Sequence, residues 1–214
     1  MYKNVFYLFA VFIHDMYDPD YKPDDLSVKV SELLVATADD ADELIDDSVQ
    51  QVLGLLRDHM KMDVVFVSEF TGARRLFKRV AMSPGHAVIA AGQSDPLETS
   101  WCQRVVDGRL PEYIANTAKL PAAAALTKDL PFPIGTHISA PIVLQDGEVY
   151  GTLCCFSFSP QDNPNPEDLK RLKFSAKLTA GRIDKGRASK PPPPPPEPGD
   201  WTLEPLPEQP LKRR

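Results

Sequence analysis

The stretch that decides the fold reads THISAPIVL (136–144), QDGE (145–148) and VYGTLCCFSFS (149–159). Its first and last segments are rich in β-branched and aromatic residues, and the Asp146-Gly147 pair between them is a strong turn signal. Two such segments joined by a short polar turn predict a β-hairpin.

Alternation within this hairpin separates an aliphatic face from a mixed face. Ile138, Ala140 and Ile142 fall on one side of the first strand, and Leu153 and Cys155 share one side of the second. The opposite side combines polar and apolar residues, namely His137, Ser139, Pro141, Thr152, Cys154 and Phe156. A buried polar group without a partner costs about 1–3 kcal/mol. We therefore expect the mixed face to line a ligand cavity, in which a few polar groups stand among apolar ones.

Strands and short helices are predicted upstream of the hairpin. Residues 63–70 and 75–80 have the composition of strands, separated by a Thr-Gly-Ala-Arg turn. Residues 83–99 predict an irregular loop, and 101–114 predict a short helix, a glycine stop and an extended exit. A second short helix is expected at 121–130.

Longer helices are expected at both ends of this region. Apolar residues recur at helical spacing from Asp39 to about Met60. Another helix is predicted from Pro166 to about residue 185, with Asn165 as its N-cap.

The order of helix, loop and hairpin resembles the second half of a GAF domain. The matching segments are Cys102 to Pro111, Pro133-Ile-Gly135, Ser139-Ala-Pro141 and YGTLCCF (150–156). The closest variety is the GAF sensor domain found ahead of cyclic-di-GMP phosphodiesterase (EAL) domains. The resemblance implies an α+β, PAS-related fold with a central antiparallel sheet, terminal helices on one face and a ligand cavity on the other. It also implies a non-catalytic sensory or regulatory module.

Composition divides the 214 residues into three regions. Turn-forming Asp and Pro residues predict a loosely ordered N-terminal arm at 1–38, followed by the GAF-like domain at 39–186. Six consecutive prolines at 191–196 predict a disordered proline-rich tail at 187–214. A docking segment for a polyproline-binding partner is the alternative for this tail.

Alternation and the resemblance together select the candidate ligand-binding residues, which are Phe77, Arg79, Trp101, Cys102, His137, Ser139, Thr152 and Cys154. Phe77 and Arg79 are assigned to one face of the second strand, where Arg79 is a candidate partner for an anionic ligand. A solvent-exposed Arg79 and a hydrogen-bonded His137 without a ligand are the alternatives. The sequence does not name the ligand or any cofactor.

The cysteines raise the alternative of a thiol-dependent enzyme. Free-methionine sulfoxide reductase, a relative of GAF domains, uses cysteine thiolates, and Cys102 lies where that family could place one. Residues 131–137 carry no cysteine where the reductase resemblance requires another. We therefore predict no catalysis, with the cysteines as core residues, and the proximity of any two cysteines distinguishes the alternatives. A degenerate GAF domain acting only as a scaffold would have a filled cavity.

Composition argues against several other classes of function. A net charge of −6 gives no reason to expect binding to nucleic acid, and the four histidines show no metal-ligand spacing. The three cysteines form no CxxC pair, which favours a reduced, cytoplasmic protein. The apolar start of the chain is too short to span a bilayer.

The two terminal helices differ in charge, the first being acidic and the second basic, so we expect them to pack side by side. The second carries a narrow apolar seam made of Leu169, Leu172, Ala176, Thr179 and Ile183. We expect the same surface to form a homodimer, and the output to act through dimerisation or a partner, because we see no effector domain in these residues.

Overall fold

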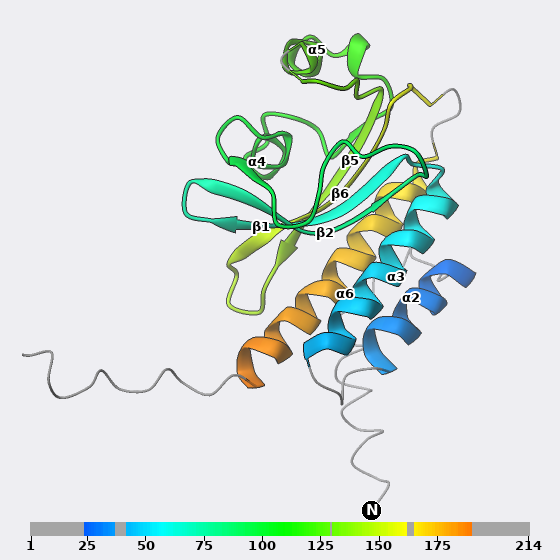
Figure 1. Cartoon of the computed structure of the whole chain (residues 1–214), viewed down its shortest axis with the longest axis vertical. Coiled ribbons are helices and arrows are strands. Elements are labelled where there is room, and N and C mark those ends of the chain that lie inside the picture. Colours follow the sequence, from blue (N-terminus) through cyan, green and yellow to red (C-terminus); the bar gives the residue numbers. More distant parts are fainter. Residues whose placement is uncertain (1–23, 37–41, 129, 162–164, 190–214) are drawn as a thin grey trace, which may run out of the picture.

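The computed structural model describes residues 24–36, 42–128, 130–161 and 165–189 (Figure 1). The elements run in the order α2 Asp25–Ala36, α3 Asp42–Met60, β1 Val64–Thr71, β2 Arg74–Met82, β3 Ser94–Pro96, α4 Trp101–Val106, β4 Tyr113–Ile114, the 3₁₀ helix η1 Thr117–Lys119, α5 Pro121–Thr127, β5 Thr136–Val143, β6 Val149–Ser157 and α6 Glu167–Ser189.

The centre of the fold is an antiparallel sheet of six strands in the order β3-β2-β1-β6-β5-β4. The predicted hairpin forms β5 and β6, and Gly147 adopts φ 86 in the turn between them. β6 then pairs with β1, so the strand that ends the hairpin lies at the middle of the sheet. The expected α+β class with a central antiparallel sheet is confirmed.

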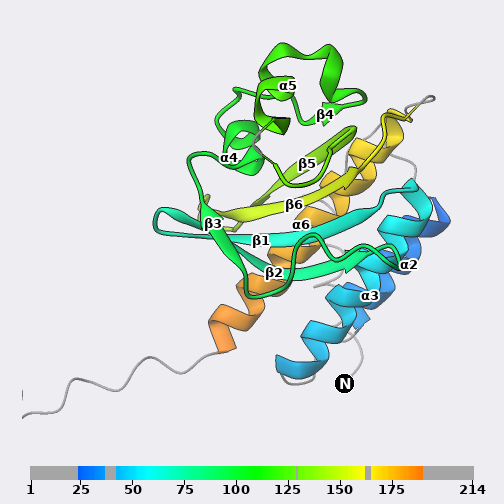
Figure 2. The same ribbon diagram turned by 45° about the horizontal axis from the view of Figure 1, so that its top comes forward.

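Each face of the sheet is covered by different helices (Figure 2). The aliphatic side of the hairpin, with Ile138, Ala140 and Leu153, packs into one core with α2, α3 and α6. The mixed side, with Cys154 and Phe156, packs into a second core with α4. The alternation therefore assigned the two faces correctly.

The helix layer contains one element that the sequence patterns did not predict. Part of the expected N-terminal arm forms α2, which packs against both α3 and α6 through Leu26, Val30 and Leu34. Arg171 of α6 forms an ion pair with Asp24 at 2.6 Å and holds the start of α2. The turn-forming residues before Asp25 led us to expect loose order, whereas the four-residue spacing of these apolar residues stabilises a helix.

The seam of α6 is used within the chain. Leu172, Ala176 and Thr179 are buried, and Leu169 and Ile183 are partly buried against the same core. Much of the surface expected to serve a second copy of the chain is therefore occupied by α2, α3 and the sheet.

Capping residues fix where the flanking helices begin. The amide of Glu167 donates to Asn165 Oδ1 at 3.1 Å, which confirms Asn165 as the N-cap of α6. Ser100 Oγ accepts from the amide of Gln103 at 3.1 Å and starts α4 at Trp101.

Several expectations fall on residues outside the described ranges. They include the first part of the arm (1–23) and the proline-rich segment of the tail (190–214). The domain limits at 38/39 and 186/187 remain predictions. Among the helices in the described ranges, none is long and apolar enough to cross a membrane.

Candidate functional site

The most unusual feature of the α4 face is the buried guanidinium of Arg75 on β2. Its Nη1 donates to Cys102 Sγ at 3.0 Å, and its Nε donates to Asp95 at 3.0 Å. Its Cζ lies 4.7 Å from the ring centroid of Phe77 and 5.8 Å from that of Phe66. Aromatic faces and a carboxylate thus hold this cation beside a thiol.

A chain of buried polar side chains continues from Cys102 across the sheet. Cys102 Sγ lies 3.2 Å from Cys154 Sγ, which in turn lies 2.9 Å from Ser139 Oγ. Cys154 Sγ donates to Thr152 Oγ1 at 3.1 Å, and Thr152 Oγ1 lies 2.9 Å from Ser68 Oγ. These groups form hydrogen bonds with one another, which removes part of the cost of burying polar groups on the mixed face.

The two thiols differ in acidity. Burial alone would raise the pKa of Cys102, but the hydrogen bond with Cys154 and the charge of Arg75 outweigh it and hold that pKa well below its usual range. Burial, together with the Cys102 sulfur, raises the pKa of Cys154. Cys102 is therefore the more acidic thiol of this pair.

His137 lies beside this network and is buried as a neutral imidazole. Burial, with a contribution from the charge of Arg75, lowers its pKa to about 3. Its ring centroid lies 5.0 Å from that of Trp101, and its Nδ1 has no hydrogen-bond partner among the described residues.

A small, partly open cavity of about 40 Å³ adjoins His137, and we call it the internal cavity because it lies on the inner side of the loop from Leu130 to Ile134. Aromatic rings form much of its wall, and Arg75 contributes the charged group. The loop from Leu130 to Ile134 closes the other side, where the ring of Phe132 stacks on Phe156 at 5.6 Å. A void of this size holds one or a few water molecules.

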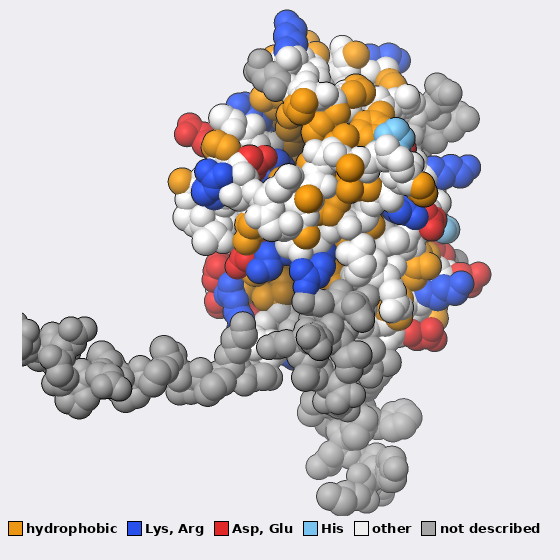
Figure 3. Space-filling view, viewed as in Figure 1, with side chains coloured by type: hydrophobic (Ala, Val, Ile, Leu, Met, Phe, Trp, Pro, Cys, Tyr) orange, Lys and Arg blue, Asp and Glu red, His pale blue; other side chains and the backbone are white. Residues whose placement is uncertain are grey.

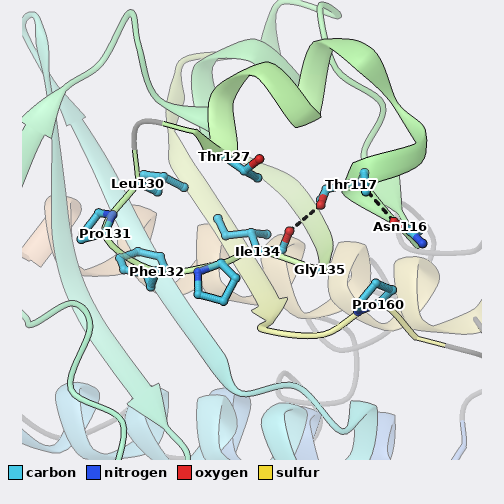
Figure 4. A pocket seen from close by; sticks show the side chains of 11 residues that line it. Asn116, Thr117, Thr127, Leu130, Pro131, Phe132, Ile134, Gly135 and Pro160 are labelled. Atoms are coloured by element: carbon cyan, nitrogen blue, oxygen red, sulfur yellow. Dashed lines mark hydrogen bonds between the residues drawn. The ribbon is translucent and has the colours of Figure 1, made fainter.

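An open groove of about 520 Å³ lies on the outer side of the same loop (Figure 4). Leu130, Phe132 and Ile134 border both the groove and the internal cavity, so this loop is the wall between them. Thr117 Oγ1 donates to the carbonyl of Ile134 and fixes one end of the wall. Figure 3 shows hydrophobic side chains gathered on this upper part of the molecule, around α4 and α5.

The predicted site residues divide into three groups. Phe77, Trp101 and His137 line the internal cavity. Cys102, Ser139, Thr152 and Cys154 form the adjacent buried network. Arg79 belongs to neither group.

A β-bulge explains the misplacement of Arg79. Phe77 pairs with Ser68 but Arg79 pairs with Val67, because the register shifts between these two residues of β1. The extra residue moves Arg79 to the helix-facing side. There, burial and the charge of Glu69 raise the pKa of Tyr150, and the charge of Arg79 offsets a small part of that rise. The expectation that Arg79 shares a face with Phe77 is therefore wrong.

Sequence reasoning also missed residues that build this site. Arg75 stands two positions before Phe77 on the same strand, so alternation alone could have placed both on one face. Asp95 and Phe132 complete the set. Asp95 lies in the short strand β3 and pairs with Arg75, so the expectation of an irregular loop over 83–99 is wrong at Ser94–Pro96. Phe132 comes from the loop before β5. Within the described ranges, no group of three or more His, Cys, Asp or Glu residues could hold a metal ion.

Comparison with known proteins identifies the family. The family profile described as GAF domain matches residues 38–184. No curated protein matches the chain.

Solved GAF structures share this fold at low sequence identity. The GAF domain of an Acinetobacter phosphoenolpyruvate-protein phosphotransferase is 15% identical with a TM-score of 0.60, covering 79% of this chain and 99% of its own. The phycocyanobilin-bound GAF domain of a cyanobacterial phytochrome is 12% identical with a TM-score of 0.62, covering 78% and 98%. Free methionine-R-sulfoxide reductase from Neisseria meningitidis is 14% identical with a TM-score of 0.58, covering 79% and 96%. At these identities the likeness shows the fold alone.

Proposed function

Because this chain belongs to the GAF domain family, we propose that it is a non-catalytic sensory module that binds a small molecule between the sheet and α4. The site is the internal cavity beside His137, reached through the loop from Leu130 to Ile134. The rest of the chain transmits occupancy of this site to a partner.

The observation that carries the proposal is the unpartnered Nδ1 of His137. A buried polar nitrogen without a hydrogen bond costs about 1–3 kcal/mol. Nδ1 is the one buried side-chain nitrogen or oxygen lining the cavity for which the described residues supply no partner. A bound molecule with a hydrogen-bonding group opposite Nδ1 would remove this cost.

The cavity walls favour a flat, mostly apolar ligand. Phe66, Phe77, Trp101 and Phe156 present aromatic surface, and rings stack well against such walls. Arg75 is already paired with Asp95, so the ligand need not be an anion. The void of about 40 Å³ is too small for such a molecule. Binding therefore requires Phe132 and its loop to move toward the outer groove.

Movement at the site has a direct route to the helix layer. β5 carries His137 on the cavity side and Ile138 on the helix side, and α6 packs against this strand. We propose that the output acts in the cytoplasm through a partner or a second copy of the chain. The sequence resemblance to GAF domains ahead of EAL domains makes a cyclic-di-GMP phosphodiesterase the first partner to test.

Native mass spectrometry tests ligand binding most directly. Protein purified under non-denaturing conditions should carry a small molecule that is released on unfolding. Ile89→Trp should abolish it by filling the cavity, because Ile89 lines it and lies in a partly exposed loop. Val88→Trp is the matched control, since Val88, the neighbour of Ile89, packs on the same core without lining the cavity.

Absence of any adduct from the wild type would count against the proposal if a ligand library also gave no thermal stabilisation. That result would favour the scaffold alternative, which the small volume of the cavity supports.

The thiol-dependent reductase remains the second candidate, because Cys102 and Cys154 lie in contact. Turnover of free methionine sulfoxide coupled to thioredoxin and NADPH, lost in Cys102→Ser, would establish it.

Dimerisation is a separate part of the proposal. Ile183 is only partly buried and lies near the end of the α6 seam. Ile183→Asp should shift a homodimer toward monomer in light scattering, while Lys185→Asp, an exposed position on the same helix, should shift it less. If the wild type is monomeric at high concentration, the proposed homodimer is wrong.

A further inference from the structure

We propose that Cys102 and Cys154 form a dithiol that hydroperoxides oxidise to a reversible disulfide, giving the domain a second, redox input. Cys102 is the attacking sulfur and Cys154 the resolving one. The thiol pair adjoins the small-molecule cavity through Arg75, but its oxidation requires no bound ligand.

The two sulfurs are already in contact. Cys102 approaches from the first turn of α4 and Cys154 from β6, and their Sγ atoms lie 3.2 Å apart. A disulfide needs about 2.05 Å between its sulfurs, so a small rotation of one side chain closes the bond. Ser139 and Thr152 hold the Cys154 sulfur from the sheet side.

The surroundings activate only one of the three cysteines. Arg75 donates directly to Cys102 Sγ and is fixed by Asp95, so its charge stabilises the Cys102 thiolate. Cys155, the neighbour of Cys154, points to the helix-side core, and burial raises its pKa. The chain therefore supplies its own inert reference thiol.

The reaction balances with a hydroperoxide as the only co-reactant. The Cys102 thiolate attacks one peroxide oxygen, the O–O bond breaks, and a sulfenic acid forms with release of hydroxide or alkoxide. The Cys154 sulfur then attacks the sulfenic sulfur, the S–O bond breaks, and its proton leaves with the hydroxide as water. In total the two thiols lose two electrons and two protons, and hydrogen peroxide becomes two water molecules.

Burial makes the site selective for small oxidants. Cys102 and Cys154 are both 0% exposed, which excludes bulky disulfides and aromatic thiol reagents. Arg75, which contacts Cys102, also lines the internal cavity, and that void has room for a molecule of water-like size. Hydrogen peroxide is the oxidant that fits this route.

The test counts thiols in the full chain after exposure to hydrogen peroxide. The protein is quenched, unfolded and alkylated, and peptides are mapped by mass spectrometry. Wild type should lose the thiols of Cys102 and Cys154 together, keep that of Cys155, and recover both with dithiothreitol. Cys155→Ala should behave in the same way.

Three variants separate the roles. In Cys154→Ser, Cys102 should be oxidised to a sulfenic acid without forming a disulfide. In Cys102→Ser, the thiols of Cys154 and Cys155 should both remain reduced. Cys102→Ala serves the same purpose if the serine variant does not fold. Arg75→Met should slow oxidation about tenfold by removing the charge that favours the thiolate. Arg79→Met, on the opposite face, should oxidise at the wild-type rate.

Two results would overturn the proposal. One is retention of all three thiols by the folded wild type under conditions that oxidise the chain unfolded in urea. The other is equal oxidation of Cys155, which would show that the reaction follows unfolding and not the geometry of the pair.

Discussion

The two faces of the sheet are built in different ways. The helix face is covered by long helices and filled by aliphatic side chains such as Ile138, Leu153 and Leu172. The α4 face is covered by the short helices α4 and α5 and by loops, and it encloses Arg75, a thiol pair and a small void. We therefore expect the first face to contribute more to stability, whereas the second has the polar groups and free volume that a sensor needs.

The largest expected effect comes from truncating the helix face. Leu153→Ala removes a side chain that is 1% exposed in a filled core and should lower the free energy of unfolding by about 3 kcal/mol. Ile134→Ala, in the wall of the internal cavity, should cost about 1 kcal/mol because the loop beside it can relax. Urea unfolding of both variants measures the difference. Equal losses would mean that the two faces are equally well packed.

Two of the arginines on β2, Arg75 and Arg79, point to opposite faces of the sheet and test the same comparison. Arg75→Met leaves Asp95 without its ion-pair partner, and breaking a fully buried pair costs about 3–5 kcal/mol. Because Asp95 is partly exposed to water, we expect the free energy of unfolding to fall by only about 2 kcal/mol. Arg79→Met on the helix side should change it by only about 0.5 kcal/mol. Thermal unfolding at neutral pH measures both, and a larger loss for Arg79 would reverse the assignment of faces at the bulge.

The strand alternation shows how much of this arrangement the sequence contains. Period-two patterning placed the hairpin, both of its faces and the positions of His137, Ser139 and Cys154, because burial on a sheet face is a local property of the strand. Arg75 was equally accessible to this reasoning. Arg79 was not, since no glycine or proline marks the bulge that displaced it.

Residues brought to the site by irregular segments lie beyond such patterns. Phe132 reaches Phe156 only through the path of the loop before β5, which tertiary packing decides. Asp95 lies on the three-residue edge strand β3 and meets Arg75 by strand pairing, but a strand this short carries no alternation to recognise in the sequence. The N-terminal helix α2 is a different case, because the spacing of Leu26, Val30 and Leu34 was present in the sequence. The Asp and Pro residues before it favour turns, which is why loose order was expected there.

Acid sensitivity should belong to the α4 face. His137 has a pKa of about 3 in the folded protein against an ordinary 6.5. Above pH 6.5 it is neutral in both states and adds no pH dependence. As pH falls from 6.5 toward 3, only the unfolded chain binds the proton, so the free energy of unfolding falls by up to about 1.4 kcal/mol per pH unit.

Stability curves of His137→Leu and wild type measure this contribution. The variant should lose less stability than wild type over that range, because the titrating group is gone. His59→Gln, at an exposed position on α3, should follow the wild type. Parallel curves for wild type and His137→Leu would show that His137 is protonated, or reaches water, in the folded state.

The smallest expected effect compares buried hydroxyls on the two sides of the molecule. Thr152 Oγ1 joins Ser68 and Cys154 on the α4 face, so Thr152→Val leaves both partners short of a hydrogen bond and should cost about 1 kcal/mol. Ser175 Oγ, in the helix layer, donates only to the carbonyl of Arg171 one turn earlier in α6. Ser175→Ala loses that local bond but gains helix propensity, so the net change should stay within about 0.5 kcal/mol. Chemical denaturation measures the change in the free energy of unfolding for both variants. If Thr152→Val and Ser175→Ala cost the same, the network around Cys154 adds nothing beyond its separate hydrogen bonds.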